Sequence, residues 1–585
     1  MSTTAPARFD ETTPLMRVLA DPRGHEIVQR ALPELVGSSI LHTLHGFPIG
    51  RVVGTEESLA PEQRSALLAQ VAAIDLTLTA PEPQRERYTV PSAGYESAPR
   101  ASARASHTAE VSLYGRFELE LRGPSHGNPF VDVELRARIE GPGARRWEVP
   151  GFYDGDGVYR LRYLPEEEGE YRFATRSNAA SLDGHEGAFS VVPAATGAHG
   201  PVRVRGTHHF AHADGTVHRP IGTTAYVWNH QGDALEEQTL RSLANGPFNK
   251  IRMCVFPKAY LFNENEPERF PFVGSVEEGF DHQRFDPSSW RRLEHRIEQL
   301  GRLGIEADLI LFHAYDRWGF STMDPVADDR YVAYAVARLA SFANVWWSLA
   351  NEYDLLPGKS EDDWERFAGI IQRDDPSDHL RSIHNCREFY DQTRPWITHA
   401  SIQRQDIVKT AEMVTEWRRF GKPVVVDECA YEGDIDQGWG NITGEEMTRR
   451  FWEGAIRGGY VGHGETYVHP DDVLWWAKGG ELRGTSPERI GFLHRIMQEH
   501  PGDLEPSTVD WDIQRAGAEG AQLLYYFGFF QPSYRRFLLD PAHEYVIDVI
   551  DTWGMTIERM EGSYRGRFRI DLPGRPYIAL RLTAI

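Results

Sequence analysis

The sequence predicts a multidomain α/β protein in which a (β/α)8 TIM barrel is flanked by smaller domains. Three observations support this fold class. The chain has 585 residues, which is too long for a single hydrophobic core. Its hydrophobic pattern changes type several times, and apolar strand-like segments alternate with helical segments in the middle part. We therefore expect one large barrel domain with helical and β-rich domains around it.

The regions outside the barrel differ in their periodicity. Residues 1–82 contain HEIVQRALPELV and APEQRSALLAQVAAI, whose apolar residues recur at three- and four-residue spacings and predict a helical segment. A polar, proline-containing stretch over 83–106 predicts a linker. Alternating runs between turn residues over 107–195 predict an antiparallel β-sandwich. Strand patterns return over 505–585 and predict a C-terminal β-sandwich domain.

The barrel itself is predicted over 200–500. Its eight expected strands are, in chain order, RPIGTTAYVW, FNKIRMCVF, EADLILFHAY, NVWWSLANE, LRSIHNC, WITHASIQ, KPVVVDECAYE and GGYVGHGETY. Helical patterns separate most of these segments, including one predicted over 406–421. Such an alternation of strands and helices is typical of a (β/α)8 barrel.

Composition limits the classes of ligand. The formal net charge of -23 argues against nucleic acid or an anionic membrane surface, because phosphate groups are bound by clustered basic residues. The 15 tryptophans and 23 tyrosines suit stacking on sugar rings, although a place in the core is the simpler explanation for any single ring. We therefore expect a small neutral carbohydrate as the substrate.

The cysteines and histidines indicate neither a disulfide framework nor a metal centre. Cys254, Cys386 and Cys429 lack CxxC spacing. Two clusters of candidate ligands do not match HExxH or another zinc spacing: His463, Glu465 and His469, and His208, His209 and His212. We therefore expect no metal and no cofactor.

The N-terminus has no apolar signal-peptide core, and no run of about 18 apolar residues follows. A cytoplasmic location without a membrane partner is therefore expected. The N-terminal helices offer a surface through which copies of the chain could form a homo-oligomer.

Polar residues at the carboxyl ends of the predicted strands are candidates for the site, because these ends meet at one face of a barrel. They are Trp228, Asn229, His230, Arg252, His313, Asp316, Arg317, Asn351, Glu352, His384, His399, Asn385, Ser401, Gln403, Asp427, Glu428, His463, Glu465 and Tyr467. A site so rich in donors and acceptors suits a ligand with many hydroxyl groups.

Two glutamates stand out among these residues. Glu352 follows the apolar run VWWSLAN at the fourth strand, and Glu428 ends VVVDE at the seventh. Across a barrel mouth they would face each other, as the two carboxyl groups of a glycosidase do. The alternative for Glu352 is an ordinary polar turn after a buried strand.

The motifs WWSLANE and VVVDE, in this order, resemble those of the retaining glycoside hydrolases of clan A. The resemblance covers residues 200–500 and implies that Glu352 is the general acid/base and Glu428 the nucleophile. It further implies that Asn351 binds the substrate 2-hydroxyl and that Arg252 keeps the nucleophile ionised. Trp475 or Trp476 would form the sugar platform.

The resemblance has one gap. The clan often places a tyrosine at the end of the sixth strand, where this chain has THASIQ, so His399 and Gln403 are the expected substitutes. His313 is expected to line the sugar pocket, and Trp228 is a further candidate for sugar binding. Glu465 either binds a sugar hydroxyl or pairs with an arginine as part of the structure.

Together these features predict a retaining exo-glycoside hydrolase acting on small glycosides or oligosaccharides of the β-pyranoside or α-L-arabinofuranoside type. A transglycosidase would use the same two glutamates. A carbohydrate-binding barrel without turnover is the third alternative, although such a protein has no need of an opposed carboxyl pair.

Overall fold

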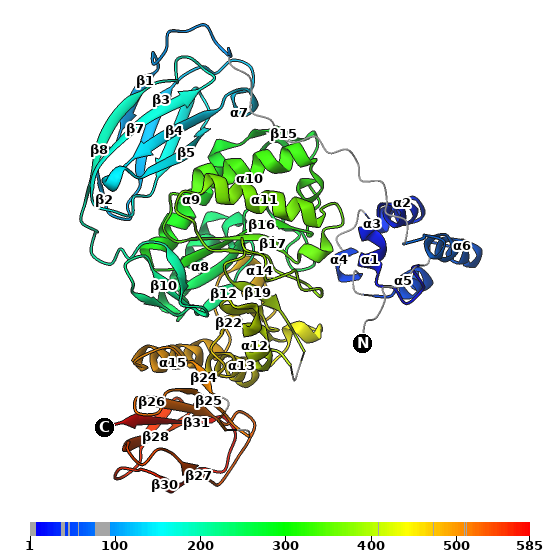
Figure 1. The fold of residues 1–585 in the computed structure, drawn as a ribbon. Coiled ribbons are helices and arrows are strands. Elements are labelled where there is room, and N and C mark those ends of the chain that lie inside the picture. Colours follow the sequence, from blue (N-terminus) through cyan, green and yellow to red (C-terminus); the bar gives the residue numbers. More distant parts are fainter. Residues whose placement is uncertain are drawn as a thin grey trace.

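The computed structural model describes residues 8–36, 41–44, 47–56, 58–76, 94–406, 409–471, 473–507, 509–510 and 512–585. A barrel with surrounding helices occupies the centre of the molecule (Figure 1). A β-sheet region from the first part of the chain lies on one side of it, and a C-terminal β-region lies on the opposite side. The predicted multidomain α/β class with a TIM barrel is confirmed.

The barrel consists of eight strands, one in each segment predicted for it. They are β12 (Gly222–Thr224), β13 (Lys250–Cys254), β16 (Glu306–His313), β17 (Val345–Asn351), β18 (Arg381–Ser382), β19 (Ala400–Gln403), β20 (Val424–Glu428) and β22 (Tyr460–His463). Neighbours pair in parallel in the order β18-β17-β16-β13-β12-β22-β20-β19. A parallel bridge between His384 and Ser401 joins the two end strands, so the sheet closes on itself.

Helices pack around the strands. They are α8 (Asp233–Asn245), α9 (Pro287–Arg302), α10 (Pro325–Leu339), α11 (Glu361–Asp374), α13 (Gly444–Ile456) and α15 (Ser486–Glu499). Two of them begin with the same device, an aspartate followed by proline. Asp286 accepts a hydrogen bond from the Ser288 amide at 2.8 Å, and Asp324 accepts from the amide of Val326 at 2.9 Å. The proline in the first turn loses no hydrogen bond there, so each sequence fixes the start of its helix.

The single helix predicted over 406–421 is wrong. Residues 407–408 lie outside the described part, and the rest forms η5 (Ala411–Met413), α12 (Val414–Trp417) and η6 (Arg418–Phe420). The Glu412 carboxylate accepts a hydrogen bond from the Thr410 amide at 3.1 Å and pairs with Arg449 of α13. These side-chain contacts compete with regular helical hydrogen bonds and tie the segment to its neighbour.

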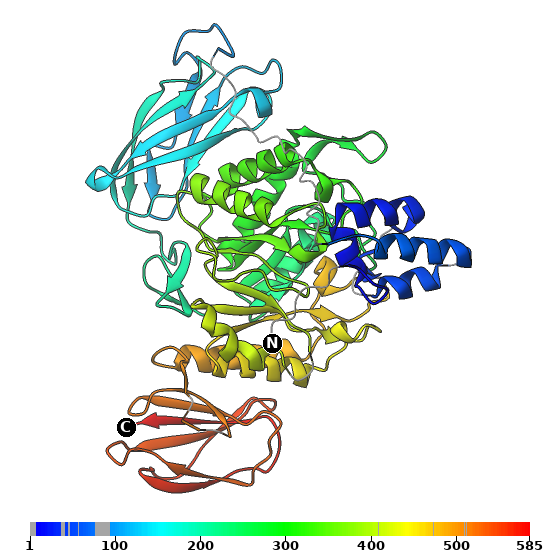
Figure 2. The same cartoon turned by 45° about the vertical axis from the view of Figure 1, so that its right-hand side comes forward.

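The N-terminal helices form a separate small module with its own core. They are α1 (Leu15–Ala20), α2 (Pro22–Ala31), α3 (Pro33–Val36), α4 (Leu41–Leu44), α5 (Ile49–Thr55) and α6 (Pro61–Ala72). Leu15, Val18, Val28, Ile49 and Val53 are completely buried among them. Of the predicted linker, residues 83–93 lie outside the described part, and β1 already begins at Arg104. The module lies against one side of the barrel (Figure 2).

The sheet region before the barrel has eight strands: β1 (Arg104–His107), β2 (Glu110–Ser112), β3 (Phe117–Arg122), β4 (Leu135–Glu140), β5 (Arg146–Tyr153), β6 (Val158–Tyr163), β7 (Gly169–Ser177) and β8 (Glu186–Val192). Their order is β1-β3-β6-β5-β4-β7-β8-β2, and they enclose a core of aromatic and aliphatic side chains. A buried ion pair at 2.8 Å between Asp154 and Arg338 of α10 attaches this region to the barrel.

The C-terminal region holds β24 (Pro506–Ser507), β25 (Gln514–Gly517), β26 (Gln522–Tyr526), β27 (Tyr534–Leu538), β28 (Tyr545–Asp551), β29 (Thr556–Arg559), β30 (Arg567–Asp571) and β31 (Ile578–Ala584). A six-stranded sheet in the order β24-β25-β26-β31-β28-β29 packs with the pair β27-β30. No helix within the described residues has the length and apolarity required to cross a membrane.

Candidate active site

A cavity of about 520 Å³ opens at the carboxyl ends of the barrel strands. Glu428, the last residue of β20, and Glu352, the first residue after β17, both line it. Both side chains are largely buried, with residue exposures of 4% and 6%. The other lining residues are Phe47, Tyr226, Lys258, Tyr260, Leu261, Phe262, Tyr315, Leu355, Cys386, Arg387, Gln403, Gln405, Tyr431, Gln437, Gly438, Trp439 and Trp476.

The carboxylate of Glu428 is surrounded by groups that favour its charged form. Its Oε1 accepts a hydrogen bond from the Arg252 guanidinium at 3.0 Å and another from the Tyr226 hydroxyl. His384 Nε2 lies 3.8 Å from the same oxygen. Because Arg252 is fully buried, this charge-assisted contact is shielded from water.

The surroundings of Glu352 are less charged. Its Oε2 accepts hydrogen bonds from the Tyr315 hydroxyl and from Asn351 Nδ2, the latter at 3.2 Å. Asn351 also connects the two carboxyl groups, since its Oδ1 accepts from Tyr226 and Arg252, each at 3.1 Å. One network of hydrogen bonds therefore runs from Glu428 through Asn351 to Glu352.

The backbone of Glu352 adopts an unusual conformation. Its φ of 54° and ψ of 57° lie in the left-handed region, which costs a residue with a side chain about 1 to 2 kcal/mol. Non-glycine residues in this region cluster at functional sites, where the surrounding structure imposes the conformation. Here the short turn η4 (Tyr353–Leu355) follows at once and turns the chain away from the strand direction.

The two carboxyl groups differ in acidity. Burial, with a contribution from the charge of Glu428, raises the pKa of Glu352 to about 7. Burial also opposes ionisation of Glu428, but His384, Arg252 and the Tyr226 hydroxyl outweigh it and hold its pKa below the ordinary value. Since burial lowers the pKa of His384 itself to about 3, Arg252 provides the permanent positive charge at neutral pH.

A buried lysine lies in the same cavity. The ammonium group of Lys258 is 3.5 Å from the ring centre of Tyr226, 4.1 Å from that of Tyr315 and 4.6 Å from that of Tyr260. Cation–π contacts with several rings compensate part of the hydration that the ammonium group loses. Its charge favours the ionised forms of both Glu352 and Glu428.

A second polar layer lies beneath the cavity. Lys250 Nζ lies 2.7 Å from both Asp427 Oδ1 and Asp308 Oδ2. The other oxygen of Asp427 accepts a hydrogen bond from Ser401 at 2.6 Å. These contacts hold the residue before Glu428 in place, so Asp427 has a structural explanation.

Two of the predicted sugar-binding residues outside the hydrogen-bonded network line the cavity. Gln403 ends β19, and within the described part of the chain its Oε1 has no hydrogen-bond partner. Trp476 lies in the short helix α14 (Trp475–Lys478), 5.5 Å from the ring centre of Tyr226. Both side chains are available to a ligand in the cavity.

The other predicted sugar-binding residues lie elsewhere, and the sequence-based assignment of each is corrected here. His399 precedes the first residue of β19 and packs against Trp346, 5.1 Å away, so it lies at the wrong end of its strand. Trp475 donates its indole N–H to Thr223 at 2.8 Å inside the core. Trp228 is fully buried beside Arg296.

His313 is likewise not a lining residue of the cavity. Its Nε2 lies 3.3 Å from the carbonyl oxygen of Phe256, and burial lowers its pKa to about 3, which keeps the ring neutral. The residue ends β16 as predicted, but its buried ring is not among the residues that line the cavity.

Glu465 belongs to a different cluster. Glu432, His463 and Glu465 are buried, with one ligand-type atom from each within 4.8 Å of the others. Glu465 accepts a hydrogen bond from the Arg483 amide at 2.7 Å, and Glu432 accepts from the Thr485 amide at the same distance. The two carboxylates thus hold the loop that leads into α15. Glu465 makes this contact with the backbone amide of Arg483, where the structural alternative predicted a pairing with an arginine.

The polar cavity residues that sequence reasoning missed include Tyr226, Tyr315 and Lys258, which act on the two glutamates. Each tyrosine follows a barrel strand by two residues, in TTAY and FHAY, and bonds to one of the two glutamates. That common spacing after a strand end would have identified the tyrosines. Lys258 lies in a loop after β13, and no pattern in the sequence predicts where its side chain points.

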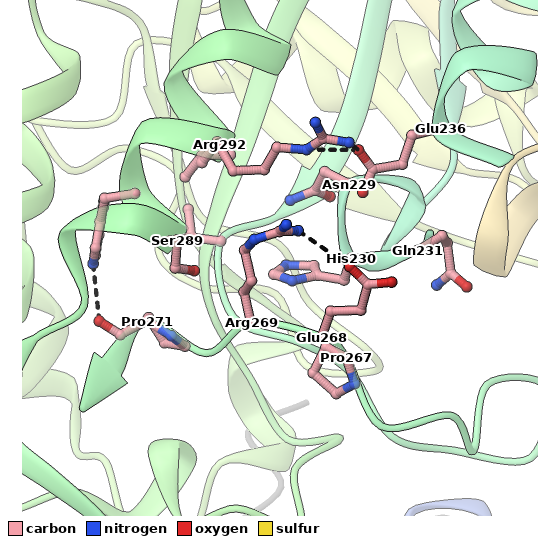
Figure 3. Close-up of a pocket in the computed structure, with 13 residues that line it drawn as sticks. Asn229, His230, Gln231, Glu236, Pro267, Glu268, Arg269, Pro271, Ser289 and Arg292 are labelled. Carbon is pink, nitrogen blue, oxygen red and sulfur yellow. Dashed lines mark hydrogen bonds and ion pairs between the residues drawn. The ribbon is translucent and has the colours of Figure 1, made fainter. Parts of the chain in front are cut away.

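A second, smaller cavity of about 30 Å³ lies between the loop after β12 and α9. Asn229 and His230, two of the predicted strand-end candidates, line this cavity together with Arg269 (Figure 3). Its wall is fixed by hydrogen bonds from Arg292 to Glu236, the shorter at 2.6 Å. The cavity has room for about one water molecule, and the residues that line it differ from those that line the larger cavity.

Comparison with known proteins connects this geometry with a family. The family described as "Apiosidase-like, catalytic domain" matches residues 205–521, and the domains of unknown function DUF5060 and DUF5605 match 110–178 and 511–583. No curated protein matches the chain.

Two solved structures from Bacteroides vulgatus ATCC 8482 extend the comparison. A protein assigned to the glycoside hydrolases shares 38% identity over 82% of this chain and 100% of its own, with a TM-score of 0.78. A family 5 glycoside hydrolase is 15% identical over 66% of this chain and 94% of its own, with a TM-score of 0.50, and supports the fold alone. The resemblance to clan A is thereby confirmed. The chain belongs to the Apiosidase-like family and is a glycoside hydrolase of the clan A type.

Proposed function

We propose that this glycoside hydrolase removes single terminal sugars with retention of configuration, using Glu352 as general acid/base and Glu428 as nucleophile. The observation that carries the proposal is the opposite shift of their pKa values within one cavity. A neutral carboxyl group and an ionised one are what the first step of such a reaction requires.

In the first step, Glu352 begins protonated. With a pKa of about 7, its carboxyl group donates a proton to the glycosidic oxygen as the bond to the anomeric carbon breaks. Ionised Glu428, held by Arg252 and Tyr226, attacks the anomeric carbon and forms a glycosyl ester. The leaving group departs as an alcohol, and Glu352 is left ionised.

In the second step, the roles of Glu352 reverse. Its carboxylate takes a proton from a water molecule, whose oxygen attacks the anomeric carbon and releases Glu428. The Tyr315 hydroxyl and Asn351 amide, which donate to Glu352, stabilise its charged form at this stage. Two inversions at one carbon give net retention.

The substrate is proposed to be a glycoside with a terminal apiosyl residue or a related pentose, after the name of the family. The cavity volume of about 520 Å³ falls in the range of small-ligand pockets and suits a single sugar with part of its leaving group. Gln403, with an unpaired oxygen, and Trp476, with a flat ring, supply a polar and an aromatic contact for the sugar.

The same two glutamates would serve a transglycosidase, in which an acceptor alcohol replaces water in the second step. A binding protein without turnover is disfavoured, because burying two carboxyl groups in one cavity costs free energy that binding alone does not require.

The test is a hydrolysis screen over aryl glycosides of both anomers of apiofuranose, arabinofuranose and the common pyranoses. The wild type is compared with Glu352→Gln, Glu428→Gln and Glu481→Gln, the last an exposed residue outside the cavity. Cleavage of one glycoside by the wild type and Glu481→Gln, with loss in the other two, supports the proposal. In added methanol, NMR of the methyl glycoside formed reports whether configuration is retained. Undiminished cleavage by either cavity variant would overturn the assignment.

A further inference from the structure

The helical module of α1 to α6 contributes to the wall of the catalytic cavity. Phe47, between α4 and α5, lines the same cavity as Glu352 and Glu428. The family matches begin only at residue 110, so this side chain comes from a part of the chain outside them. A residue more than 300 positions before Glu352 in the chain thus reaches the site through the docking of a separate module.

The position of Phe47 is fixed by the module itself. Its amide donates to the Leu44 carbonyl, and its carbonyl accepts from the Leu15 amide, both at 2.9 Å. The guanidinium of Arg51 lies over its ring at 4.9 Å. The side chain nevertheless stays 38% exposed, although it is a large apolar group. A held but uncovered aromatic ring at a cavity wall suits stacking against a ligand.

The module docks on the Glu352 side of the cavity. Helix α1 contacts η4, the turn that begins directly after Glu352. Arg17 of α1 pairs with Glu388 at 3.3 Å. The Asp354 carboxylate of η4 accepts hydrogen bonds from the Cys386 and Glu388 amides, at 2.6 and 3.0 Å, which joins these two docking points.

The position of the module identifies the part of the substrate that it contacts, provided that Glu352 is the general acid. The inference therefore rests on the proposed function. The acid protonates the oxygen of the leaving group, so the leaving group lies on the side of the acid and the cleaved sugar lies toward the nucleophile. Phe47, Leu355 and Arg387 line the cavity and belong to the elements on the Glu352 side.

We propose that the N-terminal helical module completes the leaving-group subsite and that Phe47 makes the enzyme selective for leaving groups with a flat face. A second sugar ring or an aromatic aglycone would stack on the Phe47 ring, whereas a methyl group or fluoride would not reach it. Phe47 is therefore a specificity-determining residue supplied from outside the catalytic barrel.

The first experiment compares Phe47→Ala with wild type on three glycosides of the sugar identified in the screen: a disaccharide, an aryl glycoside and the glycosyl fluoride. We expect kcat/KM to fall about threefold to tenfold for the first two, the value of one aromatic contact, and to stay unchanged for the fluoride. Phe47→Trp should retain the preference for the disaccharide and the aryl glycoside over the fluoride. Phe530→Ala, an exposed phenylalanine of the C-terminal region, is the matched control.

The steady-state constants add a second readout. After the glycosyl–enzyme forms, the leaving group has gone, so Phe47→Ala should leave kcat unchanged for activated substrates whose second step is rate-limiting. A fall in kcat/KM by the same factor for all three substrates, or no fall for any, would overturn the inference while the proposed function stands. A wild type that cleaves nothing would instead remove the proposed function, and this inference with it.

Docking of the module is tested by charge exchange. Arg17→Glu places two acidic groups opposite each other, and we expect about a twofold loss of kcat/KM with the disaccharide. The double variant Arg17→Glu/Glu388→Arg should restore the wild-type value. Equal activity of the single and double variants, both reduced, would show that the pair does not hold the module in place and would overturn the docking argument.

Discussion

The ends of β17 and β20 each place a glutamate in one cavity, but the two carboxyl groups have different surroundings. Glu428 is still part of a regular strand and has Arg252, Tyr226 and His384 around it. Glu352 lies one residue beyond its strand, in a left-handed conformation, with neutral donors as its hydrogen-bond partners.

Burial is nearly the same for the two residues, so it does not separate them. The difference arises from the placement of one guanidinium group on the Glu428 side. In a closed barrel, a neighbouring strand can thus place a guanidinium group beside one carboxyl group and not beside the other.

The largest expected effect separates the two glutamates by leaving group. Glu428→Gln should lose more than about 10⁴-fold in kcat with every substrate, because no nucleophile remains. Glu352→Gln should lose about 10² to 10⁴-fold with a poor leaving group and far less with a glycosyl fluoride, which needs no proton. Initial rates on a leaving-group series measure both. Equal losses across the series for both variants would mean that their roles are not distinct.

Removing the guanidinium group of Arg252 should make the pKa values of Glu352 and Glu428 more alike. In Arg252→Met, Glu428 loses its buried counter-ion, so its pKa rises and the acidic limb of the pH–rate profile moves to higher pH. We expect kcat/KM to fall about 10²-fold, as for the loss of a preorganised electrostatic contact. Arg252→Lys should recover only part of the lost kcat/KM, since one ammonium group does not replace the two hydrogen bonds that the guanidinium group donates to Glu428 and Asn351. An unmoved acidic limb would contradict this account.

The two tyrosines provide a matched pair of smaller changes. The wild-type profile should be bell-shaped, with activity lost above a pH of about 7 as Glu352 loses its proton. Tyr315→Phe removes a hydrogen bond that lowers the pKa of Glu352, so the alkaline limb should move to higher pH. Tyr226→Phe should move the acidic limb to higher pH by the same reasoning for Glu428. Each variant should lose about tenfold or less in kcat/KM. Movement of the opposite limb would reverse the assignment.

The smallest effect is expected for Lys258, which acts on both carboxyl groups. Its ammonium group favours their charged forms, so Lys258→Met should raise both pKa values and move both limbs to higher pH together. The loss in kcat/KM should be only a few-fold, since the lysine has aromatic rings rather than a carboxylate as its nearest neighbours. The full pH–rate profile measures this change, and a shift of one limb alone would show that Lys258 belongs to one side.

The barrel could be predicted from the sequence because its strands are continuous apolar runs and its order follows the chain. The same regularity places Asn351, Glu352 and Glu428 at or directly after strand ends, and Arg252 two residues before the end of β13. His399 was assigned wrongly because β19 runs from Ala400 to Gln403, so His399 precedes the strand instead of ending it.

Tyr226 and Tyr315 each follow a strand end by two residues, which is a local signal for their place in the cavity. Other parts of the cavity depend on contacts that no local pattern contains. Lys258 lines it from a loop after β13. Phe47 reaches it through the docking of one module on another, which requires knowledge of the whole chain. The strand-end residues Asn351, Glu352 and Glu428 could therefore be predicted, whereas Lys258 and Phe47 could not.

The left-handed backbone at Glu352 implies that another residue at this position would give the protein a higher melting temperature. Glycine adopts that conformation without steric penalty, and it would also remove a carboxyl group that is protonated only by virtue of its burial. Glu352→Gly should therefore unfold at a higher temperature than the wild type while losing catalysis. With Glu352 as the proposed acid/base, a thermostabilisation programme guided by melting temperature alone would therefore discard a residue that turnover requires.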